Sequence, residues 1–147
     1  MDPLQPLTSA NFRVVIGGVE VGISSVSGLS SETDTSTEQK DGVPTLRNVV
    51  LRRAVDGSKH LWAWRQMVVD GREDRRDVVL EHLDDLGERV VNAWTLHEAW
   101  PCRWSGPAFD SMAGGIAMEE IELSYRRLTW DHPPDPDTER IRHAGSS

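Results

Sequence analysis

The stretch RVVNAWTLHEAWPCRWSGP, Arg89 to Pro107, holds three of the six tryptophans of this chain. Four apolar residues recur in it at even-numbered positions, which in a strand places them on one face: Val90, Trp94, Leu96 and Trp100. Asn92 and Glu98 share that face, so the alternation is imperfect. The pattern predicts a strand up to Trp100, where Pro101 should break it and redirect the chain.

The composition is that of a soluble globular domain. The chain has 147 residues, of which 37% are hydrophobic and 27% charged, which suits one domain with its own core. The balance of 16 basic against 24 acidic residues gives a net charge of −8 and argues against nucleic acid or an anionic membrane as the main partner. No apolar run approaches the ~20 residues of a membrane helix, so we expect no membrane anchor. The single cysteine excludes an internal disulfide.

Upstream, the patterns favour strands and one helix. In FRVVIGGVEVGI, apolar residues recur at every second position on both sides of Gly17-Gly18, which predicts a hairpin. The two apolar sets are Phe12, Val14 and Ile16, then Val19, Val21 and Ile23. NVVLRRAV, residues 48–55, is a short strand candidate. A helix follows, with Ser58 as the expected N-cap, a stripe of Leu61, Trp64 (or Arg65) and Val68, and Gly71 as the stop.

Two segments leave alternatives open. SSETDTSTEQKDG, residues 30–42, has no large apolar side chain and is either a solvated loop or a strand that is polar on both faces. GIAMEEIELSYRRLTW, residues 115–130, fits a helix by the spacing of Met118, Ile121 and Tyr125. It also fits a strand with bulges at residues 119–120 and 126–127.

The order of strands, one helix and more strands sets the fold class. RRDVVLEHL and GERVVNAWTLHEAW flank Asp84-Asp85-Leu86-Gly87 and predict two further strands joined by that turn. We therefore expect a mainly β fold, a small antiparallel β-barrel or sandwich with one flanking α-helix. DHPPDPDTERIRHAGSS, residues 131–147, predicts an extended or disordered polar tail.

The search for chemistry finds one cluster. His97, Glu98 and Cys102 lie within six residues, but neighbours on a strand point to opposite faces and Pro101 turns the chain before the cysteine. A zinc site would also need ligands from elsewhere. Motifs for phosphate binding, zinc proteases and Ser nucleophiles do not occur in the sequence. We predict no catalytic residue, no metal ligand and no cofactor. The tryptophans suit a core or a subunit contact better than a carbohydrate-binding face.

Several segments together give the chain a resemblance to the tail-tube proteins of phages and of phage-like contractile injection systems. NFRVVIGGVEVGISSVSGLSSETD contains the turn at Ser27, Gly28 and Leu29, and NVVLRRAV with its basic pair precedes the tryptophan-bearing HLWAWRQMVVDG. RVVNAWTLHEAWPCRWSGPAFDSMAGGIAMEEIELSYRRLTW then runs through a Gly-Pro loop into an acidic-apolar strand. These segments span about residues 11–130, and residues 94–107 carry the most specific part of the resemblance.

The resemblance implies a fold, an assembly and a set of partners. It implies an N-terminal arm at 1–10, a tail-tube β-barrel domain at 11–130 and a Pro-rich tail at 131–147. Six subunits would form a ring, and stacked rings would form the hollow inner tube of a contractile injection system or phage tail. The partners would be other copies, a sheath protein, baseplate and cap proteins, and cargo protein or DNA in the lumen. Assembly is expected in the bacterial cytoplasm, with possible later release of the particle.

The resemblance also indicates which residues make assembly contacts, and it favours a strand over a helix for residues 116–130. Assembly contacts would involve Trp62, Trp64, Trp94, Trp100 and Trp104, with Ser27, Gly28 and Leu29. Members carry a long glycine-rich stacking connection where this chain has a short one, whose candidate residues are Gln39, Lys40, Asp41, Gly42, Val43 and Pro44. The short connection leaves two related alternatives, a non-contractile tail tube and a tube-initiator or baseplate hub subunit. An alternative of another class is a small ligand-binding or metal-dependent β-barrel protein.

Overall fold

The computed structural model describes residues 7–33 and 45–131, which contain ten strands and one helix. In chain order the strands are β1 (Phe12–Ile16), β2 (Val19–Val21), β3 (Ser25–Ser27), β4 (Ser31–Glu32), β5 (Thr45–Leu46), β6 (Val49–Ala54), β7 (Arg76–Leu83), β8 (Val90–Ser105), β9 (Met118–Ser124) and β10 (Arg127–Asp131). The helix α1 (His60–Val69) lies between β6 and β7. No helix in the described ranges is long and apolar enough to cross a lipid bilayer. The predicted stacking connection, residues 39–44, and the tail after residue 131 lie outside these ranges.

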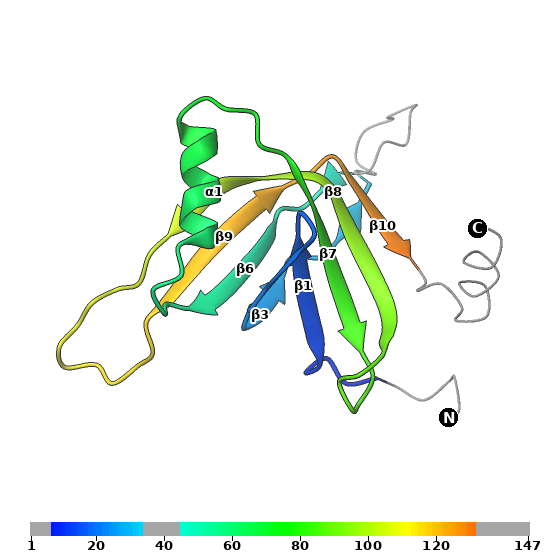
Figure 1. The fold of residues 1–147 in the computed structure, drawn as a ribbon, viewed down its shortest axis with the longest axis horizontal. Coiled ribbons are helices and arrows are strands. Elements are labelled where there is room, and N and C mark those ends of the chain that lie inside the picture. Colours follow the sequence, from blue (N-terminus) through cyan, green and yellow to red (C-terminus); the bar gives the residue numbers. More distant parts are fainter. Residues whose placement is uncertain (1–6, 34–44, 132–147) are drawn as a thin grey trace, which may run out of the picture.

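Eight of these strands form one antiparallel sheet that curls around the core, with α1 beside it (Figure 1). The strand order is β2-β1-β7-β8-β9-β6-β3, and β10 also pairs with β8. Strands β4 and β5 form a separate pair. The fold is mainly β and antiparallel with one flanking helix, as the order of sequence patterns predicted.

Strand β8 is the longest strand and pairs with three others. Over its 16 residues it pairs with β7 and β10 in its first half and with β9 in its second half. The prediction that Pro101 ends this strand was wrong, because Pro101 is buried and pairs with Leu123 of β9. The register shifts between Pro101 and Arg103. A proline lacks the N–H that a regular ladder needs, and an irregularity of this kind accommodates it.

A second irregularity in β8 changes which side chains enter the core. His97 and Glu98 together lie opposite one residue of β7, Asp77, whose Oδ1 accepts a hydrogen bond from the N–H of Glu98 over 3.0 Å. Glu98 has a φ of 53°, which is the left-handed region. After this bulge the small Ala99 is fully buried and Trp100 is not. The predicted common face of Trp94, Leu96 and Trp100 was therefore wrong at Trp100.

The first two strands form the predicted hairpin. Gly17 and Gly18 have φ values of 57° and 83°, and two successive positive values are what a tight type I′ turn requires. Val14 and Ile16 are buried, whereas Val19 is 59% exposed because β2 has only three residues and lies at one end of the sheet.

The helix ends as predicted but begins differently. It starts at His60 with Lys59 as N-cap, and no side chain caps it. The expected cap, Ser58, instead has a buried Oγ with no hydrogen-bond partner among the described residues. At the other end Gly71 has a φ of 82°, and the N–H groups of Gly71 and Arg72 bond the carbonyls of Val68 and Met67. This is a Schellman motif, in which a left-handed glycine closes the helix. Of the predicted stripe, Leu61 and Trp64 are buried and Val68 is half-buried.

Residues 118–124 and 127–131 form strands, as the family resemblance implied, and this segment contains no helix. The alternation in β9 is regular, because Glu119, Ile121 and Leu123 all face the interior. The bulge expected at residues 119–120 is absent from β9, because Glu119 is held inside by polar partners. The phase break at residues 126–127 is the boundary between β9 and β10, where the N–H of Arg126 bonds the carbonyl of His97.

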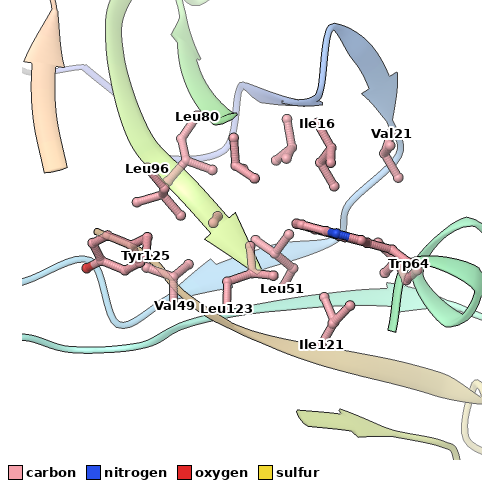
Figure 2. Close-up of a cluster of buried hydrophobic side chains, with 14 residues drawn as sticks. Ile16, Val21, Val49, Leu51, Trp64, Leu80, Leu96, Ile121, Leu123 and Tyr125 are labelled. Atoms are coloured by element: carbon pink, nitrogen blue, oxygen red, sulfur yellow. The ribbon is translucent and has the colours of Figure 1, made fainter. Parts of the chain in front are cut away.

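The core lies inside the curled sheet and against the inner side of α1 (Figure 2). Its largest fully buried side chains come from five sheet strands and the helix: Val14, Val49, Leu51, Leu61, Trp64, Val78, Leu96, Pro101, Ile121 and Leu123. Burial on this scale contributes roughly 1.5–3 kcal/mol per large side chain, which stabilises the domain without any disulfide. The polar segment after residue 30 begins as a strand, since β4 pairs with β5 and Glu32 forms an ion pair with Arg47 at 2.8 Å.

Candidate assembly surfaces

The tryptophans predicted to serve assembly occupy several different places. Trp64 is a core residue, 1% exposed, whose Nε1 donates to the carbonyl of Asp74 over 2.9 Å. Trp62 lies two residues earlier on α1 and is 42% exposed. Its ring meets that of Trp104 edge-on, with the centroids 4.7 Å apart, so this pair fastens α1 to the end of β8. Of these three, only Trp62 presents a substantial surface to a partner.

A second aromatic pair lies on the opposite half of the sheet. The rings of Trp94 and Trp130 stack with centroids 5.1 Å apart, on the neighbouring strands β8 and β10. Trp130 is 62% exposed, and its Nε1 donates to Oδ1 of Asn92 over 3.1 Å. The sequence analysis did not assign Trp130 to a site. Trp130 lies two residues after Leu128, so the two side chains would share one face of a strand, and its neighbours in the sequence are polar. Trp100 is half-buried, and its role in assembly stays a prediction.

The turn at Ser27, Gly28 and Leu29 is tight. Gly28 has a φ of 92°, and a Cβ at this position would lie 2.5 Å from the carbonyl oxygen of Asn48. Only glycine therefore permits the chain leaving β3 to pass this close to the segment before β6. Leu29 is held at the surface, 39% exposed.

That turn borders an apolar groove of about 660 Å³. Its apolar lining comes from β1, β3, β7, β8 and the turn itself: Phe12, Val26, Leu29, Leu80 and Trp94. Glu81 and His82 add polar groups at its margin. Glu81 is paired with Arg13 at 2.7 Å, and a ring nitrogen of His82 lies 2.6 Å from the carbonyl oxygen of Thr8. Both titratable side chains thus already have partners, and the groove offers mainly apolar contact beside the serines Ser9, Ser24 and Ser25.

The loop between β8 and β9, residues 106–117, is the most apolar exposed segment in the described part of the chain. It extends away from the sheet near the foot of α1 (Figure 1). Phe109, Met112 and Ile116 in this loop are 89%, 90% and 78% exposed. Sequence reasoning treated the loop only as a connection. Two features of the sequence could have indicated a contact surface here. The loop is far longer than the roughly 2–5 residues that a hairpin needs, and it contains three large apolar residues.

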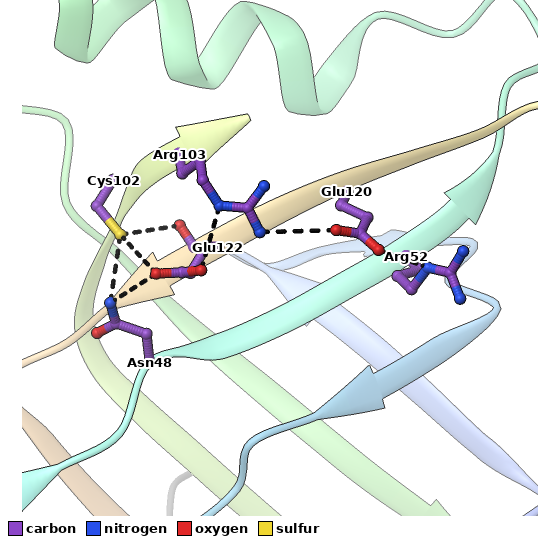
Figure 3. Close-up of polar contacts among 6 residues, drawn as sticks. All are labelled: Asn48, Arg52, Cys102, Arg103, Glu120 and Glu122. Carbon is purple, nitrogen blue, oxygen red and sulfur yellow. Dashed lines mark hydrogen bonds and ion pairs between the residues drawn. The ribbon is translucent and has the colours of Figure 1, made fainter. Parts of the chain in front are cut away.

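The outer face of β6, β9 and the end of β8 carries a ladder of paired charges (Figure 3). Glu120 pairs with Arg52 at 2.8 Å and with Arg103 at 3.6 Å, and Arg103 reaches Glu122 at 3.3 Å. The amide of Asn48 donates to Glu122 over 2.9 Å. This amide hydrogen bond, with further help from Arg103, lowers the pKa of Glu122 from its usual value. The face is therefore strongly polar with its charges largely paired.

The structure does not bring His97, Glu98 and Cys102 into one site. A ring nitrogen of His97 lies 2.8 Å from Oγ1 of Thr129, and Glu98 pairs with Arg126 at 3.3 Å. Cys102 lies instead beside Asn48 and Glu122 (Figure 3). Burial and the negative charge of Glu122 raise the pKa of the Cys102 thiol, which disfavours the reactive thiolate. In residues 7–33 and 45–131 no three His, Cys, Asp or Glu side chains are grouped to hold a metal ion.

Comparisons with known proteins agree with this geometry. A chain of the extended sheath–tube complex of an extracellular contractile injection system (PVC) is 26% identical, with a TM-score of 0.80 over 89% of this chain and 95% of that one. The PVC sheath/tube terminator complex contains a chain that is also 26% identical, with a TM-score of 0.73 over 88% and 99% of the two chains. Hcp1 from Flavobacterium johnsoniae, 18% identical with a TM-score of 0.58 over 83% of this chain and 95% of that one, shares the fold. No match was found among curated proteins.

The family itself follows from the sequence match over most of the domain. The family model for the T4-like virus tail tube protein gp19 matches residues 8–129, which includes every strand from β1 to β9 and the first three residues of β10. This range contains the groove, the apolar loop and the charged face. The chain therefore belongs to the T4-like virus tail tube protein gp19 family.

Proposed function

We propose that this chain is the inner tube subunit of a contractile injection system or phage tail, with six copies in a ring and rings stacked into a hollow tube. The observation that carries the proposal is the family match over residues 8–129. The similarity to a chain of the PVC sheath–tube complex over almost the full length of both chains supports the contractile type.

The surface of the isolated subunit supports an assembled state. Five large apolar side chains outside the core are 42–90% exposed on one loop, one helix and one strand: Trp62, Phe109, Met112, Ile116 and Trp130. In addition, β2 and β3 lie at the two ends of the strand order, and within residues 7–33 and 45–131 each has a partner on one side only. Exposed strand edges and apolar patches favour association, and a closed ring covers both. A ring interface of the obligate kind would bury on the order of 2,000 Å² or more.

The paired charges of β6, β9 and β8 suit the wall of a conduit. Strands β3, β6, β9 and the end of β8 are consecutive in the sheet, and their outer face carries Arg52, Arg103, Glu120 and Glu122 in mutual ion pairs. We assign this face to the lumen. Since each charge there already has a partner, neither acidic nor basic cargo would be held strongly as it passes. Cargo protein or DNA would thus move along a wetted wall that does not bind it.

The mechanism is mechanical and this chain makes or breaks no bond. A sheath around the tube would contract and drive the tube through a target envelope, while the subunits hold one another. The outer side of the ring would meet the sheath, and the two ends of the tube would meet baseplate and cap proteins. The chain would assemble in the bacterial cytoplasm as part of the particle.

A second role within the same family is a subunit at the end of the tube. The similarity to a chain of the PVC sheath/tube terminator complex, at the same 26% identity, favours it. The two roles differ in stacking, because a terminal subunit forms rings that do not continue on both sides. By contrast, the separate positions of His97, Glu98 and Cys102 give no support to a metal-dependent barrel.

Light scattering coupled to size-exclusion chromatography tests the proposal. A subunit mass of 16.4 kDa should appear as a species of about six subunits, or as larger stacked multiples of it. A discrete hexamer at every concentration would favour the terminal role. A monomer at all concentrations would contradict both roles.

A further inference from the structure

The apolar loop at residues 106–117 and the apolar groove at the turn 27–29 are complementary surfaces of one chain. The loop is convex and exposes Phe109, Met112 and Ile116. The groove is concave, holds about 660 Å³ and is lined by Phe12, Leu80 and other apolar side chains. No residue that lines the groove belongs to the loop. We propose that the loop of one subunit docks in the groove of a second copy, a contact that rests on the tube role proposed above.

The loop is prepared for such a contact. Oδ1 of Asp110 accepts a hydrogen bond from the N–H of Met112 over 3.0 Å, and the carbonyl of Asp110 accepts one from Ala113 over 3.1 Å. These bonds shape the tip as a turn and satisfy its one acidic side chain within the loop. A segment that is already shaped loses less conformational entropy on binding than a flexible one. Phe109 and Met112 on either side of Asp110 are the natural anchors.

The groove is equally suited to receive apolar side chains rather than a charged ligand. Its one carboxylate, Glu81, is neutralised by Arg13 at 2.7 Å. His82 is engaged through its ring by Thr8 and Asn92. A volume of about 660 Å³ falls within the roughly 300–1,000 Å³ of pockets that enclose medium-sized apolar groups. The groove therefore has room for more than one large side chain.

The geometry of the pair dictates the kind of assembly. Since the loop and the groove are different surfaces of the same chain, a head-to-tail contact between them is heterologous, and each subunit then offers one of each to its neighbours. Such a contact generates a ring when the rotation closes and a helical stack when it does not. Two copies that dock reciprocally would instead close as a symmetric dimer, which the mass measurement described above distinguishes from a ring. The competing occupant of the groove is the N-terminal segment MDPLQP, residues 1–6, because Ser9 and Ala10 line the groove.

Photo-crosslinking identifies the occupant directly. A benzophenone amino acid is placed at position 109 in the full chain, and ¹⁴N-labelled and ¹⁵N-labelled subunits are mixed before illumination. We expect mixed-isotope crosslinks from position 109 to peptides that contain Leu29 or Leu80. Crosslinks from 109 to other surfaces, or capture of residues 1–6 by benzophenone at position 29, would overturn the docking while rings remain. A wild-type protein that never assembles would overturn both this contact and the tube role.

Substitutions test the same contact through assembly. Phe109→Ser should lower the assembled fraction about tenfold or more at equal concentration, as loss of a buried anchor does. Val69→Ser, at an apolar position of α1 that is also exposed (56%), is the matched control and should change it less than about twofold. Leu29→Glu and Met112→Lys should each weaken assembly, and the double variant should recover much of it. Equal effects of Phe109→Ser and Val69→Ser, or no recovery in the double variant, would argue against the docking.

Discussion

Nε1 of Trp104 donates a hydrogen bond over 3.0 Å to Oε1 of Glu119, a carboxylate that is only 4% exposed inside the sheet. Oε2 of the same carboxylate lies 3.9 Å from Nε of Arg53, which is 6% exposed and also reaches Asp56 at 2.6 Å through Nη2. This polar group ties together β6, β8, β9 and the connection between β6 and α1. It explains why a glutamate occupies an inward position of β9 without distorting the strand.

Removal of Glu119 should strongly destabilise the fold. Glu119→Ala leaves Nε1 of Trp104 without its acceptor and removes one of the two carboxylates near the buried Arg53, which keeps Asp56 at 2.6 Å, so we expect a loss of about 1–3 kcal/mol. Thermal and urea unfolding at equal protein concentration measure this loss. Glu73→Ala is the control, because Glu73 is 83% exposed in its pair with Arg75 and should cost under about 1 kcal/mol. Similar losses in both variants would show that the buried pair does not act as described.

Gly28→Ala should disrupt the turn that borders the groove. The new Cβ would meet the carbonyl oxygen of Asn48 at 2.5 Å and the residue would keep a φ of 92°. We expect a loss well above the roughly 1–2 kcal/mol of left-handed strain alone. Gly18→Ala supplies that reference, since its φ is 83° and nothing lies within 4 Å of its added Cβ. The difference between their unfolding free energies isolates the clash, and a difference near zero would contradict it.

Trp94→Ala should be much more damaging than Trp100→Ala or His97→Ala. Trp94 packs against the core and stacks on Trp130, so its truncation should cost about 3 kcal/mol or more. Trp100 lies beyond the bulge that turns Ala99 inward, which reduces its share of the core. His97→Ala loses a contact to Thr129 worth about 1 kcal/mol. Chemical denaturation ranks the stabilities of the three variants. Loss of function in His97→Ala with intact rings would instead support the hypothesis that the chain is an enzyme.

Acid should weaken the fold partly through Glu122. Its pKa is lowered in the folded state, chiefly by the hydrogen bond from Asn48, so it contributes stability above the ordinary value of about 4.3. That contribution is lost as the pH falls through the lowered folded value. Glu122→Gln should therefore show a shallower loss of thermal stability between about pH 5 and pH 3 than the wild type. Glu73→Gln controls for charge removal, and parallel curves for wild type and Glu122→Gln would refute this role.

The sequence predicted the strands well because alternation and turn residues are local. The Gly17-Gly18 hairpin, the Gly71 helix stop and the mainly β class follow from such local signals. The errors at Pro101 and Trp100 have long-range causes. Pairing with Leu123 carries β8 through Pro101, and the bulge opposite Asp77 reverses the faces after Leu96.

The candidate site was predicted less completely than the fold. Trp62 and the turn at Gly28 and Leu29 were identified from the family resemblance, and both lie at the surface. The groove could not be read from sequence, because its walls come from four strands that meet only after folding. The role of the loop at Phe109 was missed because the sequence does not show that its apolar side chains are exposed. Whether residues 39–44 stack rings stays a prediction.

Electron microscopy of the purified full chain tests the central claim most directly. The account predicts rings with sixfold symmetry and a central channel, seen alone or stacked into tubes, with the charged face of Arg52 and Glu120 toward the channel. Single particles of about 16 kDa without symmetry, or rings whose channel is lined by the opposite side of the sheet, would contradict it.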